Sequence, residues 1–472
     1  MRYISTRGAT SPMHFQEAVL AGLAPDGGLL MPETIPSLGN KLENLLGLNF
    51  EDLAFEIMHE YIDDIDSEDL RSLVHRSYSS FDSPDVTPLI AVGPLHILEL
   101  FHGPTLAFKD VALQFLGNLF EYLLSSRNQH MNILGATSGD TGSAAIAGVR
   151  GKENISIFIM YPQGKPSRLQ ELQMTTVTDD NVFCMAVNGS FDDCQSLMKS
   201  IFNDLEFKKS FHLGAVNSVN WARVLAQVVY YAYASLKLSK GLTQSVSFCV
   251  PTGNFGDILA GYIAKKMGFP IKTLVLASNE NDILPVFFNT GIYKKGGVQF
   301  TLSPSMDIQV ASNFERYLFL NSGMDSDVVC RFMEEFESKG EVRLEHNHPA
   351  DETIRAVAIN TRETLDIIGQ YYKDYSYVLD PHTAVGVAAA RLIKSDEPVV
   401  CLATAHPAKF PDAIRTALDE DDASIEALKH ASLNQLEELE ERSEAMEPDV
   451  DLLKDYIRAH AFETGKVDAI HS

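Results

Sequence analysis

Short apolar segments alternate with amphipathic segments through most of this chain, and this alternation limits the folds available to it. The apolar segments are continuous, as expected for parallel strands that are buried on both faces. We expect strands at 87–92, 95–101, 131–136, 155–161, 181–187, 211–216, 245–251, 273–278, 377–380 and 399–404. Repeated strand–helix units of this kind predict an α/β fold with doubly wound domains.

The segments between these runs have the 3.6-residue period of amphipathic helices. One helix is expected after Lys109 and another after Ser190, where Asp193 occupies the capping-box position. Residues 1 to about 90 are expected to form a mainly helical region. From about residue 421 the chain is acidic, and we expect a solvent-exposed helix there.

Composition narrows the class of protein. The 472 residues suffice for two or three domains, and 45% apolar and 22% charged residues are ordinary for a soluble globular protein. The net charge of −26 argues against a nucleic-acid partner, because phosphate backbones require a basic surface. No apolar run reaches the roughly 18–20 residues of a membrane span, and we expect no signal peptide. An odd number of cysteines without a CxxC pair predicts buried free thiols, a cytoplasmic location and no metal site; they are Cys184, Cys194, Cys249, Cys330 and Cys401.

Lys109 stands in an unusual position within ELFHGPTLAFKD (99–110). It follows a Gly-Pro turn and has apolar neighbours at the start of a predicted helix. Lone lysines at helix starts are usually solvated charges, but these neighbours predict an amine that is shielded from bulk water. Desolvation makes a lysine amine more nucleophilic, so Lys109 is a candidate catalytic lysine.

A glycine-rich turn, PTGNFGD (251–257), joins a predicted strand to a predicted helix. Gly253 and Gly256 would let backbone N–H groups approach a phosphate closely. The turn could equally be an ordinary strand–helix connection. A reactive lysine and a glycine-rich phosphate loop are together what a protein needs to hold pyridoxal phosphate.

A second such turn lies in GATSGDTGSAAIAG (135–148). Its backbone N–H groups and the hydroxyls of Thr137, Ser138 and Thr141 could hold a substrate carboxylate. A plain turn with a good helix cap is the alternative.

Two further segments carry polar side chains at element ends. In VVCLATAHPAKFPDAI (399–414), Thr404 ends a strand, where a hydroxyl suits a pyridine nitrogen, and Lys409 follows. Asn217, Ser218, Asn220 and Arg223 open a helix in NSVNWAR (217–223). Because the whole chain is acidic, an anionic ligand needs local cations, and Arg223 and Lys409 are the candidates for binding a substrate phosphate.

The motifs, taken in order, closely resemble those of threonine synthases. The matching segments are YISTRG (3–8), APDGGLLMPE (24–33), ELFHGPTLAFKD, GATSGDTGSAAIAG, NSVNWAR, PTGNFGD, SNENDI (278–283), LSPSMDIQVASNFER (302–316) and ATAHPAKFP (403–411). The resemblance implies a fold-type II pyridoxal-phosphate enzyme with two doubly wound α/β domains of the tryptophan synthase β-like kind and a helical N-terminal region. It points to the branch with a long N-terminal region, found in bacteria and fungi. The domains it implies are 1–90, then 91–108 with 240–472, and a smaller one at 109–239.

The resemblance assigns roles residue by residue. Lys109 matches the lysine that forms the Schiff base, and Thr404 matches the hydroxyl at the pyridine nitrogen. The cofactor-phosphate loop matches Gly253, Asn254, Phe255, Gly256 and Asp257, and the substrate-carboxylate loop matches the turn with Thr137, Ser138, Asp140 and Thr141. Many relatives have an asparagine at Asp140 that contacts the cofactor's phenolic oxygen. A carboxylate cannot donate that hydrogen bond unless protonated, so Asn217 or Asn220 could supply it instead.

The implied reaction converts O-phospho-L-homoserine and water to L-threonine and phosphate by γ-elimination and β-hydration. Lys109 would act as general base at the α- and β-carbons. A phospholyase that releases 2-oxobutyrate would share nearly every motif, and a non-catalytic cofactor-binding protein is a further alternative. The substrate is the only partner expected, in a monomer or small homo-oligomer.

Overall fold

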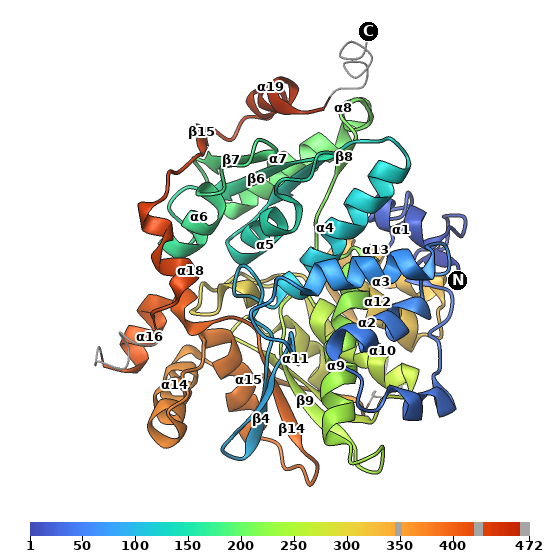
Figure 1. Ribbon diagram of the computed structural model, residues 1–472, viewed down its shortest axis with the longest axis vertical. Helices are drawn as coiled ribbons and strands as arrows, with labels where there is room; N and C mark the ends of the chain where they lie inside the picture. Colours follow the sequence, from blue (N-terminus) through green and yellow to red (C-terminus); the bar gives the residue numbers. More distant parts are fainter. Residues whose placement is uncertain (345–351, 420–427, 463–472) are drawn as a thin grey trace. The chain divides into compact units, whose positions relative to one another are not determined.

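The computed structural model describes residues 1–344, 352–419 and 428–462 (Figure 1). The chain divides into two compact units. The first contains Met1–Ala112 and Ser218–Leu428, and the second contains Leu113–Asn217 and the chain from Lys429 onward. These bounds differ from the sequence-based division, which assigned 109–239 to the smaller domain and the whole acidic tail to the larger one. That division stays a prediction.

The first unit is built on a six-stranded sheet with the order β13-β10-β9-β14-β4-β3. Neighbouring strands are parallel except for β3 and β4, which are antiparallel. The strands are β3 (Leu89–Val92), β4 (Leu95–Glu99), β9 (Val246–Pro251), β10 (Ile271–Ser278), β13 (Ile354–Ala358) and β14 (Val399–Ala403). The runs of β9 and β14 are almost wholly buried, which confirms the prediction of parallel strands covered on both faces.

Helices cover this sheet and carry most of the residues discussed below. α15 (Pro381–Arg391) packs on β9, β10 and β14, and α9 (Trp221–Leu238) packs against α10 (Gly256–Met267). The other described elements of the unit are η1 (Gly39–Leu45), α11 (Ile283–Thr290), β11 (Ile292–Lys294), η2 (Pro304–Met306), α12 (Phe314–Asn321), α13 (Ser326–Lys339), β12 (Glu341–Arg343), α14 (Thr361–Tyr375), η3 (Pro407–Lys409) and α16 (Pro411–Ala417).

The N-terminal part of the first unit is mainly helical, as expected. It contains α1 (Phe15–Ala21), α2 (Phe50–His59) and α3 (Ser67–Tyr78), with a small antiparallel pair of β1 (Tyr3–Ser5) and β2 (Leu30–Pro32). Arg316 ties this part to the rest of the unit, since its Nε and Nη2 donate to the carbonyl oxygen of Leu30 at 3.2 and 2.9 Å. Burial lowers the pKa of Arg316 to about 9, and its hydrogen bonds to oxygen keep the guanidinium satisfied.

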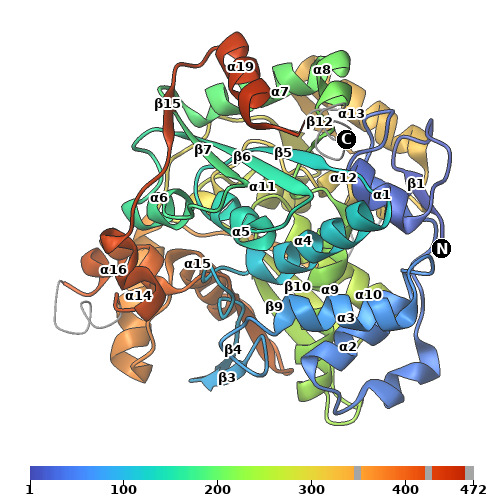
Figure 2. The same ribbon diagram turned by 45° about the horizontal axis from the view of Figure 1, so that its top comes forward.

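The second unit has a five-stranded parallel sheet with the order β15-β7-β6-β5-β8. Figure 2 labels four of these strands, β15, β7, β6 and β5. The unit's strands are β5 (Met131–Ala136), β6 (Ile155–Pro162), β7 (Val182–Val187), β8 (Leu213–Gly214) and β15 (Glu444–Met446). Its helices are α4 (Lys109–Ser126, shared with the first unit), α5 (Asp140–Val149), α6 (Arg168–Thr175), α7 (Phe191–Asn203), α8 (Leu205–Ser210), α18 (Ala431–Asn434), η4 (Leu436–Glu438) and α19 (Val450–His460). α7 starts with the predicted Ser190–Asp193 capping box.

Two sequence-based expectations are wrong. Residues 377–380 form no strand, because they lead directly into the start of α15, whose N-cap is Asp380. The acidic tail is not simply a solvated helix: β15 pairs with β7, and Leu453 and Ile457 of α19 enter the core of the second unit. The expected surface helix also falls partly on residues 420–427, which lie outside the described residues. Strand pairing and burial of this kind depend on long-range contacts rather than on local sequence.

Cys184, Cys194, Cys249 and Cys401 are buried free thiols, as predicted, whereas Cys330 is partly exposed. Across the described ranges, no helix is both long and apolar enough to cross a membrane. The same residues contain no cluster of three or more His, Cys, Asp or Glu side chains that could hold a metal ion.

Candidate active site

Three adjacent strands of the first unit bring the predicted cofactor residues to one edge of the sheet. β9, β14 and β4 are parallel neighbours, so their carboxyl ends meet there. The loop at 252–255 follows β9, Thr404 follows β14, and the chain after β4 leads to Lys109. Ligands of open α/β sheets bind outside the carboxyl ends of strands, so this edge is the candidate site.

Lys109 is the first residue of α4 and is only 8% exposed, which excludes a solvated surface lysine. Its Nζ donates to Ser305 Oγ at 3.4 Å. The preceding residue, Phe108, donates its backbone N–H to the carbonyl oxygen of Thr404 at 2.8 Å. The backbone that carries Lys109 is therefore fixed directly to the strand exit that carries Thr404.

Lys409, expected to bind a substrate phosphate, lies in a different environment. It is fully buried, and its Nζ donates to the carbonyl oxygen of Thr105 at 2.7 Å. Thr105 in turn donates its backbone N–H and its hydroxyl to Asp110 at 2.8 and 2.7 Å. Burial raises the pKa of Asp110 to about 6, and the charge of Lys409 opposes this shift. The Lys409 ammonium thus supports the segment around Lys109, and its role in binding a substrate phosphate stays a prediction.

The glycine-rich loop after β9 enters α10 through a strained residue. Phe255 has φ of 65°, and Gly256 begins the helix. A Cβ on Gly253 would lie 2.5 Å from the carbonyl oxygen of Ser305. The need for glycine at 253 thus comes from close backbone packing against Ser305, whereas we expected it to come from a ligand. The start of α10 still offers unsatisfied backbone N–H groups suited to a phosphate.

The carboxylate of Asp257 bonds to two tyrosines and does not suit phosphate binding. Its Oδ1 accepts hydrogen bonds from the hydroxyls of Tyr230 and Tyr231 at 2.5 and 2.8 Å. Burial raises its pKa to about 6, opposed by these hydrogen bonds and by the charge of Lys109. A carboxylate would repel a phosphate, so only the backbone of Asp257 suits the phosphate loop.

Arg223 is a buried cation of α9 that has vacant donors. Its side chain is 5% exposed, and Nε and Nη1 contact no hydrogen-bond partner among the described residues. Burial lowers its pKa to about 10. One turn further along α9, Gln227 Oε1 lies 3.8 Å from the position of a Cβ on Gly256. Arg223 therefore keeps donors available on the same helix that packs against the loop, as a phosphate ligand requires.

The polar residues that precede Arg223 have fewer groups left to bind a cofactor or substrate. Asn220 is fully buried, where its side chain accepts from Ala222 N at 3.1 Å and donates to the carbonyl oxygen of Val19 at 2.9 Å. It caps α9, which makes it a structural residue rather than the cofactor contact considered above. Ser218 Oγ lies 2.9 Å from Ser312 Oγ. Asn217 belongs to the second unit, and its Oδ1 has no partner in the part of the chain described.

The predicted carboxylate turn lies in the second unit, between β5 and α5. Thr137 Oγ1 accepts from the backbone N–H groups of Gly139 and Gly142, both at 3.0 Å, so this hydroxyl serves the turn itself. Asp140 Oδ1 accepts from Gln170 Nε2 at 2.8 Å. Ser138 is exposed and Thr141 is partly exposed.

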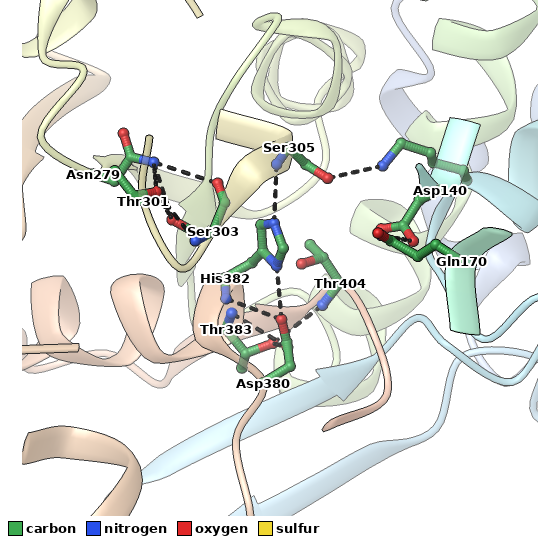
Figure 3. Close-up of polar contacts among 11 residues, drawn as sticks. Asp140, Gln170, Asn279, Thr301, Ser303, Ser305, Asp380, His382, Thr383 and Thr404 are labelled. Atoms are coloured by element: carbon green, nitrogen blue, oxygen red, sulfur yellow. Dashed lines mark hydrogen bonds and ion pairs between the residues drawn. The ribbon is translucent and has the colours of Figure 1, made fainter. Parts of the chain in front are cut away.

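Sequence reasoning missed four polar residues that hydrogen bonds connect to Lys109 and Thr404; three of them are buried and Ser305 is partly buried (Figure 3). They are Ser305, Asp380, His382 and Thr383, and their hydrogen bonds connect η2, the start of α15 and the end of β14. A signal was present in the segment Asp-Pro-His-Thr, since Asp before Pro at a helix start is a strong cap and the histidine lies in the first turn.

Comparisons with known proteins identify the family of this chain. A family model described as pyridoxal-phosphate dependent enzyme matches residues 83–405. Models of the threonine synthase N terminus and of the threonine synthase C-terminal region match residues 2–78 and 383–457. Threonine synthase of Schizosaccharomyces pombe is 49% identical over 457 residues, which cover 88% of this chain and 89% of the relative. The Eremothecium gossypii threonine synthase is 47% identical over 98% of both chains.

The chain belongs to the threonine synthase family.

Two solved threonine synthases share its fold. The pyridoxal-phosphate-bound enzyme from Brucella melitensis has a TM-score of 0.93 and 42% identity, covering 98% of this chain and 99% of its own. The yeast enzyme has a TM-score of 0.92 and 44% identity, covering 97% and 98%. The predicted fold-type II architecture and the pyridoxal phosphate cofactor are therefore confirmed.

The residues of this threonine synthase family member fit the cofactor. The edge of the sheet combines a buried lysine amine, the N-terminus of the 12-residue α10 and a threonine at a strand end. These groups suit an aldehyde, a phosphate and a ring nitrogen, respectively.

Proposed function

We propose that this protein is a threonine synthase that converts O-phospho-L-homoserine and water to L-threonine and phosphate. The observation that supports this most is the meeting of Lys109, the loop at 252–255 and Thr404 at the carboxyl ends of three adjacent strands. A cytoplasmic enzyme with a small-molecule substrate is part of this proposal, and it accords with the four buried free thiols.

Lys109 supplies the amine that binds the cofactor and later moves the protons. When bound, pyridoxal phosphate supplies an electron sink for the substrate carbanion. The backbone at 253–257 would hold the cofactor phosphate with N–H groups at the start of α10, and the Thr404 hydroxyl would serve its ring nitrogen. Lys109 Nζ would act as the general base that takes the α-proton and then a β-proton of the substrate.

Arg223 binds the phosphate of the substrate. Its buried guanidinium has two nitrogens without partners among the described residues, and an arginine fork matches phosphate oxygens. A vacant buried cation is costly unless a ligand satisfies it. In an acidic protein of net charge −26, such a local cation is what allows a doubly charged substrate to bind.

The turn at 137–141 binds the substrate carboxylate with backbone N–H groups. Thr137 shapes the turn through its bonds to Gly139 and Gly142. Ser138 and Thr141 offer hydroxyls, while Asp140 orders the turn through Gln170. Asn217, with a vacant Oδ1, and Ser218 are secondary candidates for substrate contacts.

Product analysis tests the reaction. The purified protein is supplied with pyridoxal phosphate and O-phospho-L-homoserine, and threonine, phosphate and 2-oxobutyrate are measured. We expect threonine and phosphate in a one-to-one ratio, and no product from Lys109→Ala. Release of 2-oxobutyrate in place of threonine would assign the phospholyase activity instead. Cofactor binding at Lys109 without either product would identify a non-catalytic binding protein.

A further inference from the structure

A chain of hydrogen bonds leads from Lys109 to Asp380 within the first unit. Figure 3 labels three of its members, Ser305, His382 and Asp380. Lys109 Nζ donates to Ser305 Oγ at 3.4 Å, a long contact of the kind that tightens when substrate binds. The backbone N–H of Ser305 donates to His382 Nε2 at 3.2 Å, and His382 Nδ1 lies 3.0 Å from Asp380 Oδ1. His382 and Asp380 are 3% and 1% exposed, so water cannot replace these partners.

This arrangement determines which nitrogen of His382 carries the proton. A backbone N–H can only donate, so Nε2 must accept from Ser305. Nδ1 therefore bears the hydrogen and donates to the carboxylate of Asp380. The same oxygen, Asp380 Oδ1, also accepts from the backbone N–H of His382 at 2.9 Å, so an acceptor is held toward Nδ1.

The other oxygen of Asp380 serves a second branch. Asp380 Oδ2 accepts from the hydroxyl of Thr383 and from its backbone N–H. The hydroxyl oxygen of Thr383 accepts in turn from the backbone N–H of Thr404 at 3.2 Å. Figure 3 shows the two branches leaving Asp380, one toward Ser305 and one toward Thr404.

We infer that Asp380 is a positioning residue that aligns two groups of the cofactor site at once. Through His382 it holds the Ser305 hydroxyl at Lys109 Nζ, and through Thr383 it holds Thr404. Ser305 is then a further catalytic residue, because its hydroxyl contacts the amine that moves the protons. This inference rests on the proposed function, which takes Lys109 and Thr404 as the cofactor-facing groups.

Ser305 stabilises the protonated lysine nitrogen by accepting its hydrogen bond, which eases the return of each proton to Lys109. Two carboxylates also face this chain: Asp257 of α10 interacts with the charge of Lys109, and Asp307 would interact with His382 if that imidazole became protonated. Both carboxylates remain in all variants below, so a changed pH profile reports on the hydrogen-bond chain.

The test compares Ser305→Ala, His382→Leu, His382→Gln and Asp380→Asn with the parent, each loaded with pyridoxal phosphate. Ser338→Ala is the matched control, because this exposed serine only caps the end of α13. Two readouts are taken: the pH midpoint of the bound cofactor's absorbance change, and kcat and KM for O-phospho-L-homoserine.

We expect Ser305→Ala to lower kcat about 10- to 100-fold while KM changes less than about twofold. The absorbance midpoint should fall by about one pH unit, because the charged nitrogen loses its acceptor. Asp380→Asn should shift both readouts in the same direction by a smaller amount. Its amide oxygen can still accept from His382, but it carries no charge, and its NH2 group would face the backbone N–H of Thr383. His382→Gln, which can still accept from that N–H, should recover most of the activity lost in His382→Leu.

The double variant Ser305→Ala/His382→Leu should be no worse than the poorer single variant, because both act on one hydroxyl. Multiplying effects, or an Asp380→Asn protein with a lowered melting temperature but an unchanged midpoint, would overturn the inference. If His382→Leu does not fold, Asp380→Asn and His382→Gln decide between these outcomes. If the parent binds the cofactor but makes no threonine, the proposed function fails. The pH midpoints of the cofactor absorbance change still test the role of Asp380 and Ser305 in that case.

Discussion

The hydroxyl of Tyr231 donates to Asp257 Oδ1 at 2.8 Å, directly behind the loop assigned to the cofactor phosphate. Tyr230 donates to the same oxygen, while Asp257 Oδ2 has no partner among the described residues. The two phenols hold the start of α10 against α9, and they stabilise a carboxylate that burial would otherwise neutralise.

Asp257→Asn should make stability less dependent on pH. The folded-state pKa of Asp257 is raised to about 6 from 3.8, so its contribution to stability is complete below pH 4 and is lost as pH rises through 6. Relative to the parent, the variant should therefore gain about 2 kcal/mol in free energy of unfolding between pH 4 and pH 6. Urea unfolding across this range measures the difference. Asp412→Asn, at a side chain 98% exposed, should show a constant difference; the same constancy at 257 would contradict the prediction.

Gly253→Ala should weaken cofactor binding at least about tenfold. The added Cβ would stand 2.5 Å from the carbonyl oxygen of Ser305, so the loop or η2 must move. Fluorescence titration of the apoprotein with pyridoxal phosphate measures the dissociation constant. Gly296→Ala is the control, because a Cβ there meets nothing within 4 Å. Equal affinities for the two variants would show that close packing at 253 does not shape the loop.

Arg223→Met should raise KM for the phosphorylated substrate about 10- to 100-fold without destabilising the apoprotein. The guanidinium is buried with vacant donors, so its removal relieves a desolvation cost before substrate binds. Thermal unfolding with and without inorganic phosphate provides a second readout. With pyridoxal phosphate bound in the loop at 253–257, inorganic phosphate should stabilise the parent more than the variant. An unchanged KM would remove Arg223 from the substrate site.

Lys409→Met should lower the free energy of unfolding by about 3 kcal/mol and leave KM little changed, the reverse of the pattern expected for Arg223→Met. The loss of its charge leaves Asp110 buried without its compensating cation. Urea unfolding of the single variant and of Lys409→Met/Asp110→Asn tests this cause, because the second substitution should restore much of the stability. A large rise in KM with unchanged stability would return Lys409 to the phosphate site.

The sequence was sufficient to locate the parts of the site that follow local rules. The strand at 131–136 and the helix beginning at Lys109 lie where the apolar runs and the 3.6-residue period predict them. The burial of Lys109 followed from its apolar neighbours. Such features depend on residues close together in the chain.

Residues whose role depends on distant partners could not be predicted in this way. Lys409 looked like an available cation, but its acceptor on Thr105 is 304 residues away in the chain. The apolar run at 377–380 resembled a strand, and the local helix-start signal of Asp380-Pro381 was overlooked. The hydrogen bonds that link this start to Ser305 and Thr404 join residues 77 and 21 positions apart, and no local pattern reveals them. Buried polar networks of this kind are specified by tertiary structure, which a single sequence does not display.

The hydrogen bonds of Arg316 have a consequence for attempts to make a smaller enzyme. The pyridoxal-phosphate family model begins at residue 83, which suggests a minimal fragment without the N-terminal helices. Such a fragment would remove Leu30, whose carbonyl oxygen accepts twice from Arg316, and leave a buried guanidinium facing empty space. Arg316 also donates to Asn313, which bonds to the carbonyl oxygen of Asn254 in the phosphate loop. Removing the N-terminal residues would thus disturb the loop assigned to the cofactor phosphate. Replacing Arg316 by an uncharged residue at the same time would avoid this effect.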